Sequence, residues 1–441
     1  MKHNPLPCCI ILTLLSASAL AADWNQWRGP SGVGISQAKS LPTQWSEKKN
    51  IAWKTALPGR GWSSPVIEGD RIWVTAAHET LASEEASRRR LKSNTGSQPL
   101  VVLEKARFHA ICIHIDSGKI LHNVELFSVD EPQWVHRFNS YASPTPVIED
   151  GRVYCHFGTY GTACVDSSRG KVLWSNLELH CMHENGPGGS PVIAENVLFF
   201  HMDGSDEQYV AALNKKDGKL AWRTRRSGKL HSNPQLKKAY STPLVMRRGN
   251  ATELISAGAN WVYGYDPVTG EEKWRVDYER LGFSNVARPV SGEGMLFLST
   301  CFMRAEMLGI SLKGQPEIVW RYRKSVPSSP SPVYVDGLLF FVGDSGGLVT
   351  CLEAKSGKLV WSERIASGKY WAAPLAAAGR IYFHSEEGVT TVIKAGREFK
   401  VIAESSLDGK LMASAAVAGD ALFLRTDKAL YRVSNKVPSL R

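Results

Sequence analysis

Histidine and arginine side chains in this sequence gather just ahead of short apolar runs, where they could bind an anionic or metal-bound ligand. The richest stretch, residues 180–186, reads HCMHENG. The candidate ligand-binding residues are Arg60, His136, His180, His183, His231, Arg288, Tyr370 and Trp371. The alternative is that these side chains only satisfy exposed backbone groups of loops. That alternative is favoured because metal-ligand spacing such as His-Glu-x-x-His is missing.

Two carboxylates, Asp203 and Asp206, lie in the turn HMDGSDEQ and could hold Ca²⁺. A Ca²⁺ site takes about six to eight oxygen ligands, and this turn does not offer them, so we predict no metal site. The sequence also lacks a Gly-x-Ser-x-Gly nucleophile motif, a phosphate-binding glycine loop and a catalytic pair of carboxylates. No catalytic residue is therefore predicted.

The elements that must position these side chains are seen most clearly in residues 329–365. Apolar runs at 331–335, 338–342, 348–353 and 359–361 are separated by Asp336-Gly337, by the glycine-rich stretch 343–347 and by Ser356-Gly357-Lys358. Short apolar runs split by such turns are typical of antiparallel hairpins. We therefore predict a four-stranded antiparallel sheet, which is too small to fold without stacking on similar units.

Copies of this unit fill the chain. The start of an apolar run recurs at intervals of 42 to 52 residues, with one interval of 81, at Pro65, Pro146, Pro191, Pro243, Pro289, Pro332, Pro374 and Ala416. A period of this length with four strands per unit is typical of a β-propeller. The predicted fold is all-β, an eight-bladed propeller in which the loops leading into each first strand gather at one mouth of the central channel.

The last unit has only three predicted strands, the third at residues 429–433, while residues 50–54 form a strand with no blade before them. Pairing these two segments would close the ring and remove an open sheet edge. Tryptophans recur at the start of the fourth strands, and we interpret them as wedges between neighbouring blades. These inter-blade tryptophans are Trp53, Trp174, Trp222, Trp274, Trp320 and Trp361.

The ends of the chain flank this ring. Residues 1–21 carry a basic start, an apolar core and the small-x-small site Ala19-Leu20-Ala21, which predict a cleaved signal peptide. Cys8 and Cys9 precede the apolar core, so we expect no lipobox and a periplasmic or secreted product. Residues 22–49 are expected to strap the propeller, 50–436 to form it, with an insertion at about 78–107 in blade one, and 437–441 to form a tail.

Charge and cysteine content add weaker expectations. The net charge of +11 suits contact with acidic polymers or lipid head groups, and it is also what an exported protein can have without such a partner. We expect no nucleic-acid partner, no membrane span and a monomer. Cys155 and Cys164 would face each other if Thr159-Tyr160 is a two-residue turn. They would then form a cross-strand disulfide, or else remain two packed thiols.

The fourth-strand turns carry a resemblance to a known family. VDSSRGKVLW, ALNKKDGKLAW, YDPVTGEEKW and CLEAKSGKLVW resemble the repeat A-L-D-x-x-T-G-x-x-x-W of pyrroloquinoline-quinone-type (PQQ-type) propellers, over about residues 50–434. The opening WNQWRGPSGVGIS resembles exported quinoprotein-repeat proteins of planctomycete-type bacteria. The fold is also similar to that of the outer-membrane assembly lipoprotein, a bare eight-bladed ring that docks partner proteins.

The resemblance implies two functions. The first is an exported non-catalytic binding or scaffold module for a protein or an envelope polymer, with no cofactor. The alternative is a PQQ-dependent oxidoreductase with a ligand site at the channel mouth. Quinoprotein alcohol dehydrogenases hold the quinone with Ca²⁺ beside a vicinal disulfide, whereas the only adjacent cysteines here are Cys8 and Cys9. A third idea, a carbohydrate-acting enzyme, would need converging carboxylates at the mouth.

Overall fold

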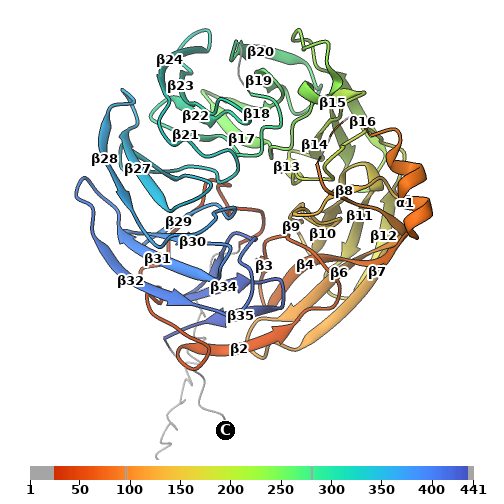
Figure 1. Cartoon of the computed structure of the whole chain (residues 1–441), viewed down its shortest axis with the longest axis horizontal. Coiled ribbons are helices and arrows are strands. Elements are labelled where there is room, and N and C mark those ends of the chain that lie inside the picture. The colour runs from red at the N-terminus through yellow and green to blue at the C-terminus, as the bar shows by residue number, and fades with distance from the viewer. Residues whose placement is uncertain (1–23, 95, 97, 280–281, 436–441) are drawn as a thin grey trace, which may run out of the picture.

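The computed structural model describes residues 24–94, 96, 98–279 and 282–435, so the expected signal peptide and C-terminal tail lie outside the described residues. The described chain is nearly all β, and eight small antiparallel sheets are arranged around a central axis as an eight-bladed propeller (Figure 1). The predicted fold class is therefore confirmed. No described helix is long and apolar enough to cross a membrane.

Each blade is a meander whose first strand lies nearest the axis. The strands of blades one to four are β3 (Val66–Glu68), β4 (Arg71–Leu81), β6 (Leu103–His114) and β7 (Ile120–Asp130); β9 (Val147–Glu149), β10 (Arg152–His156), β11 (Thr162–Asp166) and β12 (Lys171–Asn176); β13 (Val192–Ala194), β14 (Val197–Asp203), β15 (Gln208–Asn214) and β16 (Leu220–Arg225); β17 (Leu244–Arg248), β18 (Ala251–Ala257), β19 (Trp261–Tyr265) and β20 (Glu272–Asp277).

The second half of the ring repeats the pattern. The strands of blades five to eight are β21 (Val290–Gly292), β22 (Met295–Ser299), β23 (Met307–Ser311) and β24 (Glu317–Tyr322); β25 (Val333–Val335), β26 (Leu338–Val342), β27 (Leu348–Glu353) and β28 (Leu359–Arg364); β29 (Leu375–Ala377), β30 (Arg380–His384), β31 (Val389–Lys394) and β32 (Val401–Ser406); β33 (Ala416–Ala418), β34 (Ala421–Arg425), β35 (Ala429–Val433) and β2 (Ile51–Ala56).

Turn chemistry explains why the strands reverse where they do. Asp336 and Gly337 between β25 and β26 have φ of 45° and 79°, the left-handed conformation that a tight two-residue hairpin requires. The second, third and fourth strands of this blade then follow the predicted apolar runs. Central strands are buried on both faces, as in β26, so each sheet is sandwiched between its neighbours.

The ring is closed by the N-terminal strand, as predicted. β2 pairs antiparallel with β35, with Trp53 opposite Arg432 and Ala56 opposite Ala429 (Figure 1). Strands far apart in sequence therefore share one sheet, and blade eight has four strands like the others. Closure leaves the ring without an unpaired blade edge at the junction of the two chain ends.

The tryptophan wedges connect neighbouring blades at the turn before the fourth strand. Five indole Nε1 groups donate to backbone carbonyls of the next blade, at 2.9 to 3.1 Å: Trp53 to Ile115, Trp174 to Lys215, Trp222 to Pro267, Trp320 to Ala354 and Trp361 to Gly396. Trp274 differs, because its Nε1 donates to Glu253 Oε2 of its own blade at 2.9 Å. A buried carboxylate in β18 thus replaces the next blade as hydrogen-bond partner.

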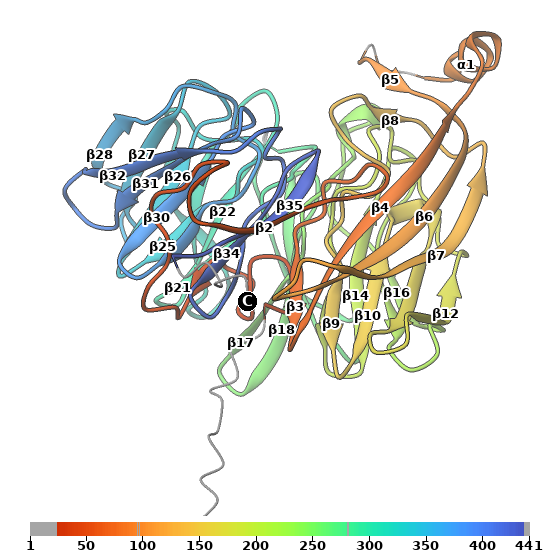
Figure 2. The same ribbon diagram turned by 90° about the horizontal axis from the view of Figure 1, so that it is seen from below.

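The residues expected to be an insertion in blade one are more regular than a loop. β4 and β6 stay paired along their length, from the pair Arg71 and His114 to the pair Leu81 and Leu103. Beyond them come α1 (Glu84–Leu91), capped by the Ser83 hydroxyl, and β5 (Leu100–Val101), which pairs with β8 (Val135–His136). Figure 2 shows α1 and β5 standing out beyond the ring on the side of β8.

Of the two alternatives for Cys155 and Cys164, the described structure has two packed thiols and no disulfide. Residues 158–160 form a 3₁₀ turn, η1 (Gly158–Tyr160), instead of a two-residue hairpin loop. This shifts the register, so Cys155 pairs with Ala163, and Cys164 pairs with Tyr154. Adjacent register positions point to opposite faces of a sheet. Both thiols are free and buried, each in a different core cluster.

Candidate functional site

The loops that lead into the first strands converge on one cavity at the mouth of the channel, as the sequence analysis expected of a propeller. Its volume is about 480 Å³, within the range of small-molecule sites. All eight blades line it, through residues that include Trp62, His136, Phe138, Thr145, Ser190, Thr242, Ser284, Ser329, Trp371 and Ser414. Two loops between second and third strands add Cys301, Phe302 and Asp344.

The N-terminal segment, residues 24–34, closes the channel beneath this cavity. It reaches the innermost part of several blades, through hydrogen bonds of Trp24 with Ile67, Asn25 O with Ile148 N, Trp27 Nε1 with Ser414 Oγ and Arg28 with Pro332 O. β1 (Ile35–Ser36) then pairs in parallel with β29. Trp24 is buried, whereas Trp27 lines the cavity. The strap is thus also the channel's floor, which the sequence analysis did not foresee.

Two buried arginines hold the N-terminal segment. Arg28 donates to Val33 O and Pro332 O at 2.8 and 2.6 Å, and Arg288 donates to Trp27 O at 3.0 Å. Burial and the neighbouring Arg288 lower the pKa of Arg28 to about 9. Gly32 is required here, since a Cβ at this position would lie 2.5 Å from the Arg288 guanidinium. Arg288 therefore supports the floor and does not line the cavity.

An aromatic collar, which we define as Trp62, Phe138, Phe302 and Trp371, walls the cavity. Trp62 Nε1 donates to Phe138 O at 3.0 Å, and Trp371 Nε1 donates to Glu386 Oε2 at 2.8 Å, which fixes both indoles. The Phe138 and Trp371 ring centroids are 6.3 Å apart. Phe138 and Phe302 are among the exposed large apolar side chains of the described chain. The collar therefore presents apolar surface to solvent at the mouth.

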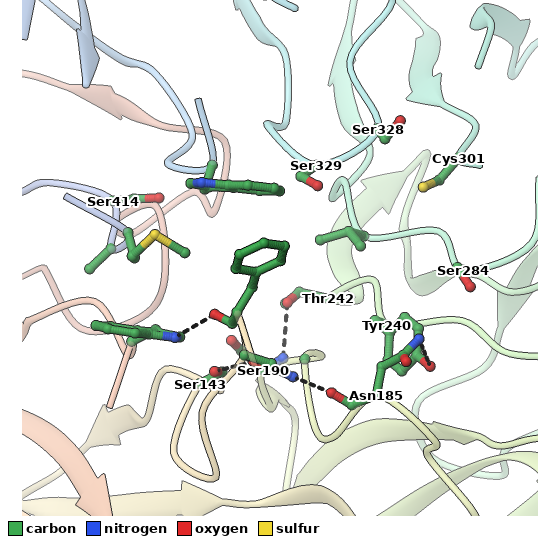
Figure 3. A pocket seen from close by; sticks show the side chains of 18 of the residues that line it. Ser143, Asn185, Ser190, Tyr240, Thr242, Ser284, Cys301, Ser328, Ser329 and Ser414 are labelled. Atoms are coloured by element: carbon green, nitrogen blue, oxygen red, sulfur yellow. Dashed lines mark hydrogen bonds between the residues drawn. The ribbon is translucent and has the colours of Figure 1, made fainter. Parts of the chain in front are cut away.

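A chain of hydroxyl groups, the hydroxyl belt, lines the channel two residues ahead of each first strand in five consecutive blades. Four hydrogen bonds link the five residues in the order Ser414, Ser64, Thr145, Ser190 and Thr242. In each bond the backbone N–H of one residue donates to the side-chain hydroxyl of the next, at 2.9 or 3.0 Å. Figure 3 shows the last of these bonds inside the pocket. In four of the five blades the sequence signal is a Ser or Thr directly before the repeated proline, and in the fifth Ser414 precedes Ala415.

The cavity is poor in charge. Among the described lining residues there is no arginine or lysine, and Asp344 is the one carboxylate. Both Asp344 oxygens already accept backbone N–H groups of Ser328 and Ser329, at 2.9 to 3.0 Å. Burial, followed by the charge of Arg137, lowers the pKa of His136, so its imidazole is neutral at pH 7. Apart from Asp344, the cavity therefore offers apolar faces and neutral polar groups.

Of the candidate ligand-binding residues, the structure places His136 and Trp371 in the cavity wall. The others have different contacts. Arg60 donates to the carbonyls of Arg137 and Asn139 and braces the collar from outside. His183 is buried, accepts Thr159 N–H at 3.0 Å, and has its pKa lowered to about 4 by burial.

The remaining candidates also lie away from the cavity lining. His180 is exposed, and its Nδ1 is 3.3 Å from Thr159 O. His231 is exposed and accepts the N–H of Asn233. Tyr370 is buried, with its hydroxyl donating to Ala366 O. The interpretation that these loop residues satisfy backbone groups thus describes most of the set.

The two carboxylates of the Asp203–Asp206 turn are engaged by protein donors. Asp203 is buried and makes two hydrogen bonds to the Arg226 guanidinium, at 3.0 and 2.6 Å. Asp206 accepts Met182 N–H at 2.7 Å. No group of three or more metal-ligating side chains occurs in the described ranges.

The cavity itself does not fit a calcium-bound quinone. Such a cofactor carries several carboxylates and needs cationic or hydrogen-bonding partners for them, besides oxygen ligands for the metal. The described lining holds no arginine or lysine, and its one carboxylate, Asp344, is occupied by backbone donors. Cys301 is a single buried thiol, not one of a vicinal pair.

Comparison with protein families gives a matching model, described as outer membrane protein assembly factor BamB. It matches residues 162–314 and 258–421, together more than half of the chain. Curated relatives with that name include proteins of Moranella endobia, 25% identical over 250 residues, and Escherichia coli, 24% identical over 246 residues. Each alignment covers 52% of this chain and 58% of the relative, so the chain spans little more than half of these relatives.

Solved structures show the same architecture at low sequence identity. A europium-containing methanol dehydrogenase superposes with a TM-score of 0.64 at 10% identity, covering 91% of this chain and 89% of the other. BamB from Moraxella catarrhalis gives a TM-score of 0.53 at 12% identity, covering 76% and 95%. At these identities the likeness establishes the fold alone.

Proposed function

The chain belongs to the family described as outer membrane protein assembly factor BamB, and on that premise we propose that it is an exported, non-catalytic binding module. It engages a protein or an envelope polymer through the loop-bearing face and works in the periplasm or outside the cell. The family name supports a role in binding other components rather than in chemistry on a small substrate.

The observation that carries this proposal is the construction of the mouth. Loops from all eight blades converge on a cavity of about 480 Å³ whose wall is aromatic and whose polar groups, apart from the Asp344 carboxylate, are neutral. Exposed apolar side chains that cluster around a cavity mark interaction sites. The N-terminal segment bonds to several blades beneath this cavity, which favours approach of a ligand from the loop-bearing face.

The alternative, a PQQ-dependent oxidoreductase, is weakened by the same residues. The structural likeness to a methanol dehydrogenase is a likeness of fold. The described lining lacks basic side chains for the quinone carboxylates, and its single carboxylate, Asp344, is satisfied by two backbone N–H groups. We therefore assign the mouth to binding rather than to redox chemistry.

A titration of the purified protein with PQQ and Ca²⁺ separates the two functions. We expect no saturable change in the quinone absorption spectrum and no dye-linked oxidation of alcohols. Stoichiometric quinone binding with alcohol oxidation would overturn the proposal.

A second experiment tests binding directly, through retention of the protein on isolated Gram-negative envelope fragments. The variant Trp62→Ala/Trp371→Ala should lose retention at least about tenfold, because truncating buried or half-buried aromatic anchors at interfaces typically costs more than about 1 kcal/mol each. The control is Leu220→Ala, an exposed apolar residue of β16 on the outer edge of blade three. Equal loss in both variants, or none in the first, would contradict a role for the mouth.

A further inference from the structure

We propose that the cavity at the channel mouth binds a neutral sugar ring, one unit of an envelope oligosaccharide. This inference rests on the proposed function, since it names what the binding face takes. It follows from three features of the cavity: its aromatic wall, its hydroxyl groups that donate to no described protein acceptor, and a lining in which Asp344 is the one charged side chain.

The wall suits the apolar faces of a pyranose. Sugar rings present C–H groups on their faces, and the electron-rich faces of tryptophan and phenylalanine attract such weakly positive edges. Trp62 and Trp371 are each held by an indole hydrogen bond, so little freedom is lost when a ring stacks on them. Phe138 contacts both. Its carbonyl accepts the hydrogen bond of Trp62, and its ring centroid is 6.3 Å from that of Trp371.

The hydroxyl belt offers donors that the protein itself does not use. Thr145, Ser190 and Thr242 are at most 4% exposed, and each hydroxyl accepts a backbone N–H. Within the described ranges, none of these three hydroxyl groups donates to a protein acceptor. A polar group buried without its partner costs free energy, which a ligand hydroxyl at this position would recover.

Two further hydroxyls face the cavity without protein partners. The Ser284 and Ser329 side chains line it from blades five and six and are half-buried (Figure 3). In the described structure neither hydroxyl makes a hydrogen bond. Together with the belt they place neutral donors and acceptors on several sides of the cavity, which is what a ring with hydroxyl groups on its whole circumference requires.

Charge favours a neutral ring over an acidic one. The basic side chains nearest the mouth lie against the collar rather than in the cavity: Arg60 is 5.5 Å from the Trp62 ring centroid, and Arg137 and Lys369 are 5.4 and 5.7 Å from that of Phe138. An anionic sugar buried among the belt hydroxyls would have no counter-charge.

A peptide fits the cavity less well than a sugar. Extended peptides bind by adding a strand to an exposed sheet edge. At the mouth, the first strands present their ends and not an open edge. Four of the backbone N–H groups that precede these strands already donate to hydroxyls of the belt. Binding without cleavage is the expected outcome, because glycoside hydrolysis uses two carboxylic side chains, and Asp344 is the one carboxylate of the described lining.

Isothermal titration calorimetry of the mature protein with cellotetraose, chitotetraose and maltotetraose tests the inference. We expect at least one of these neutral probes to bind saturably with one site per chain. Trp62→Ala and Trp371→Ala should each weaken binding at least about tenfold, and Trp371→Phe less than about threefold.

Ser329→Ala is the sharper variant, because its hydroxyl makes no bond in the described structure and its loss should leave the thermal midpoint unchanged. We expect about three- to tenfold weaker binding from the lost hydrogen bond. Leu220→Ala is the control and should bind as the native protein does.

Three results would overturn the inference: no binding of any neutral probe, binding that survives loss of both indoles, or saturable binding only of trigalacturonate or of an aromatic pentapeptide. If the neutral probes fail while retention on envelope fragments still depends on Trp62 and Trp371, the sugar is wrong and the binding face stands. If both fail, the proposed function fails as well.

Discussion

At the residue scale, position in the loops predicted the mouth where the candidate cavity lies, but not which side chains line it. His136 and Trp371 lie in the cavity wall, whereas His183 and Arg288 are buried in supporting roles. Sequence could not separate these cases, because burial depends on contacts between loops of different blades. His183 is buried because the 3₁₀ turn η1 folds over it and donates Thr159 N–H to its ring.

Buried histidines predict a loss of stability in mild acid. Burial lowers the pKa of His156 to about 3, and burial likewise lowers those of His183, His201 and His384 to about 4. In the unfolded chain these groups titrate near 6.5. Between about pH 6.5 and 4 the unfolded state therefore binds more protons, so the free energy of unfolding falls as pH falls, by up to about 1.4 kcal/mol per pH unit for each histidine.

Urea unfolding at pH 7.5 and 5.5 measures this effect. His384→Gln should reduce the change in the free energy of unfolding between the two pH values by the contribution of one buried histidine, because His384 is buried. His231→Gln, at an exposed position, is the control. A free energy of unfolding that is unchanged between the two pH values would contradict the account.

At the element scale, the blades were predictable because they repeat, whereas the exceptions to the repeat were not predictable. The apolar runs and glycine turns fixed strand order, because a period-two pattern between left-handed turns has few other folds. Trp274 keeps the spacing of the other wedges yet donates its hydrogen bond to Glu253, since the repeat says nothing about a carboxylate two strands away in the same blade. Likewise the register of Cys155 depended on η1, which no residue pattern announced.

The wedges predict a matched pair of glycine variants. Gly218 has φ of 73°, and a Cβ there would lie 2.4 Å from the Trp174 ring, while Gly249 has φ of 61° and open space around it. Gly249→Ala should cost about 1–2 kcal/mol, the price of a left-handed residue. Gly218→Ala should cost about 1–3 kcal/mol more, because the indole must move. Chemical denaturation checks this, and equal losses would show that Trp174 does not pack on the turn.

At the scale of the whole molecule, closure was predictable and the blocked channel was not. The last unit has three predicted strands and one unpaired sheet edge, and the first predicted strand has no blade before it. The sequence alone therefore implied that the two pair. The course of residues 24–34 depends on Arg28 and Arg288 reaching carbonyls across the channel. Arg28 lies outside the repeat, and Arg288 stands directly before Pro289 where most other blades have Ser or Thr, so periodicity offered no signal for the floor of the pocket.

Closure predicts that linking the two chain ends stabilises the ring. Ala56 in β2 and Ala429 in β35 are directly opposite, so Ala56→Cys/Ala429→Cys can form a cross-strand disulfide. Because it closes a loop of several hundred residues, it should raise the free energy of unfolding by about 4 kcal/mol or less, depending on strain. Thermal unfolding with and without reductant measures this, since the reduced variant is its own control. No change on reduction would argue against the β2–β35 pairing.

The most direct test of the account asks which face of the ring meets its ligand. A photoreactive benzoylphenylalanine is placed at Phe302 in the collar or at Val268 in an outer turn, both exposed, and each protein is irradiated with isolated envelope fragments. The account predicts discrete adducts with protein or polymer from position 302 that disappear in the Trp62→Ala/Trp371→Ala background, and none from position 268. Adducts from position 268 alone would contradict it.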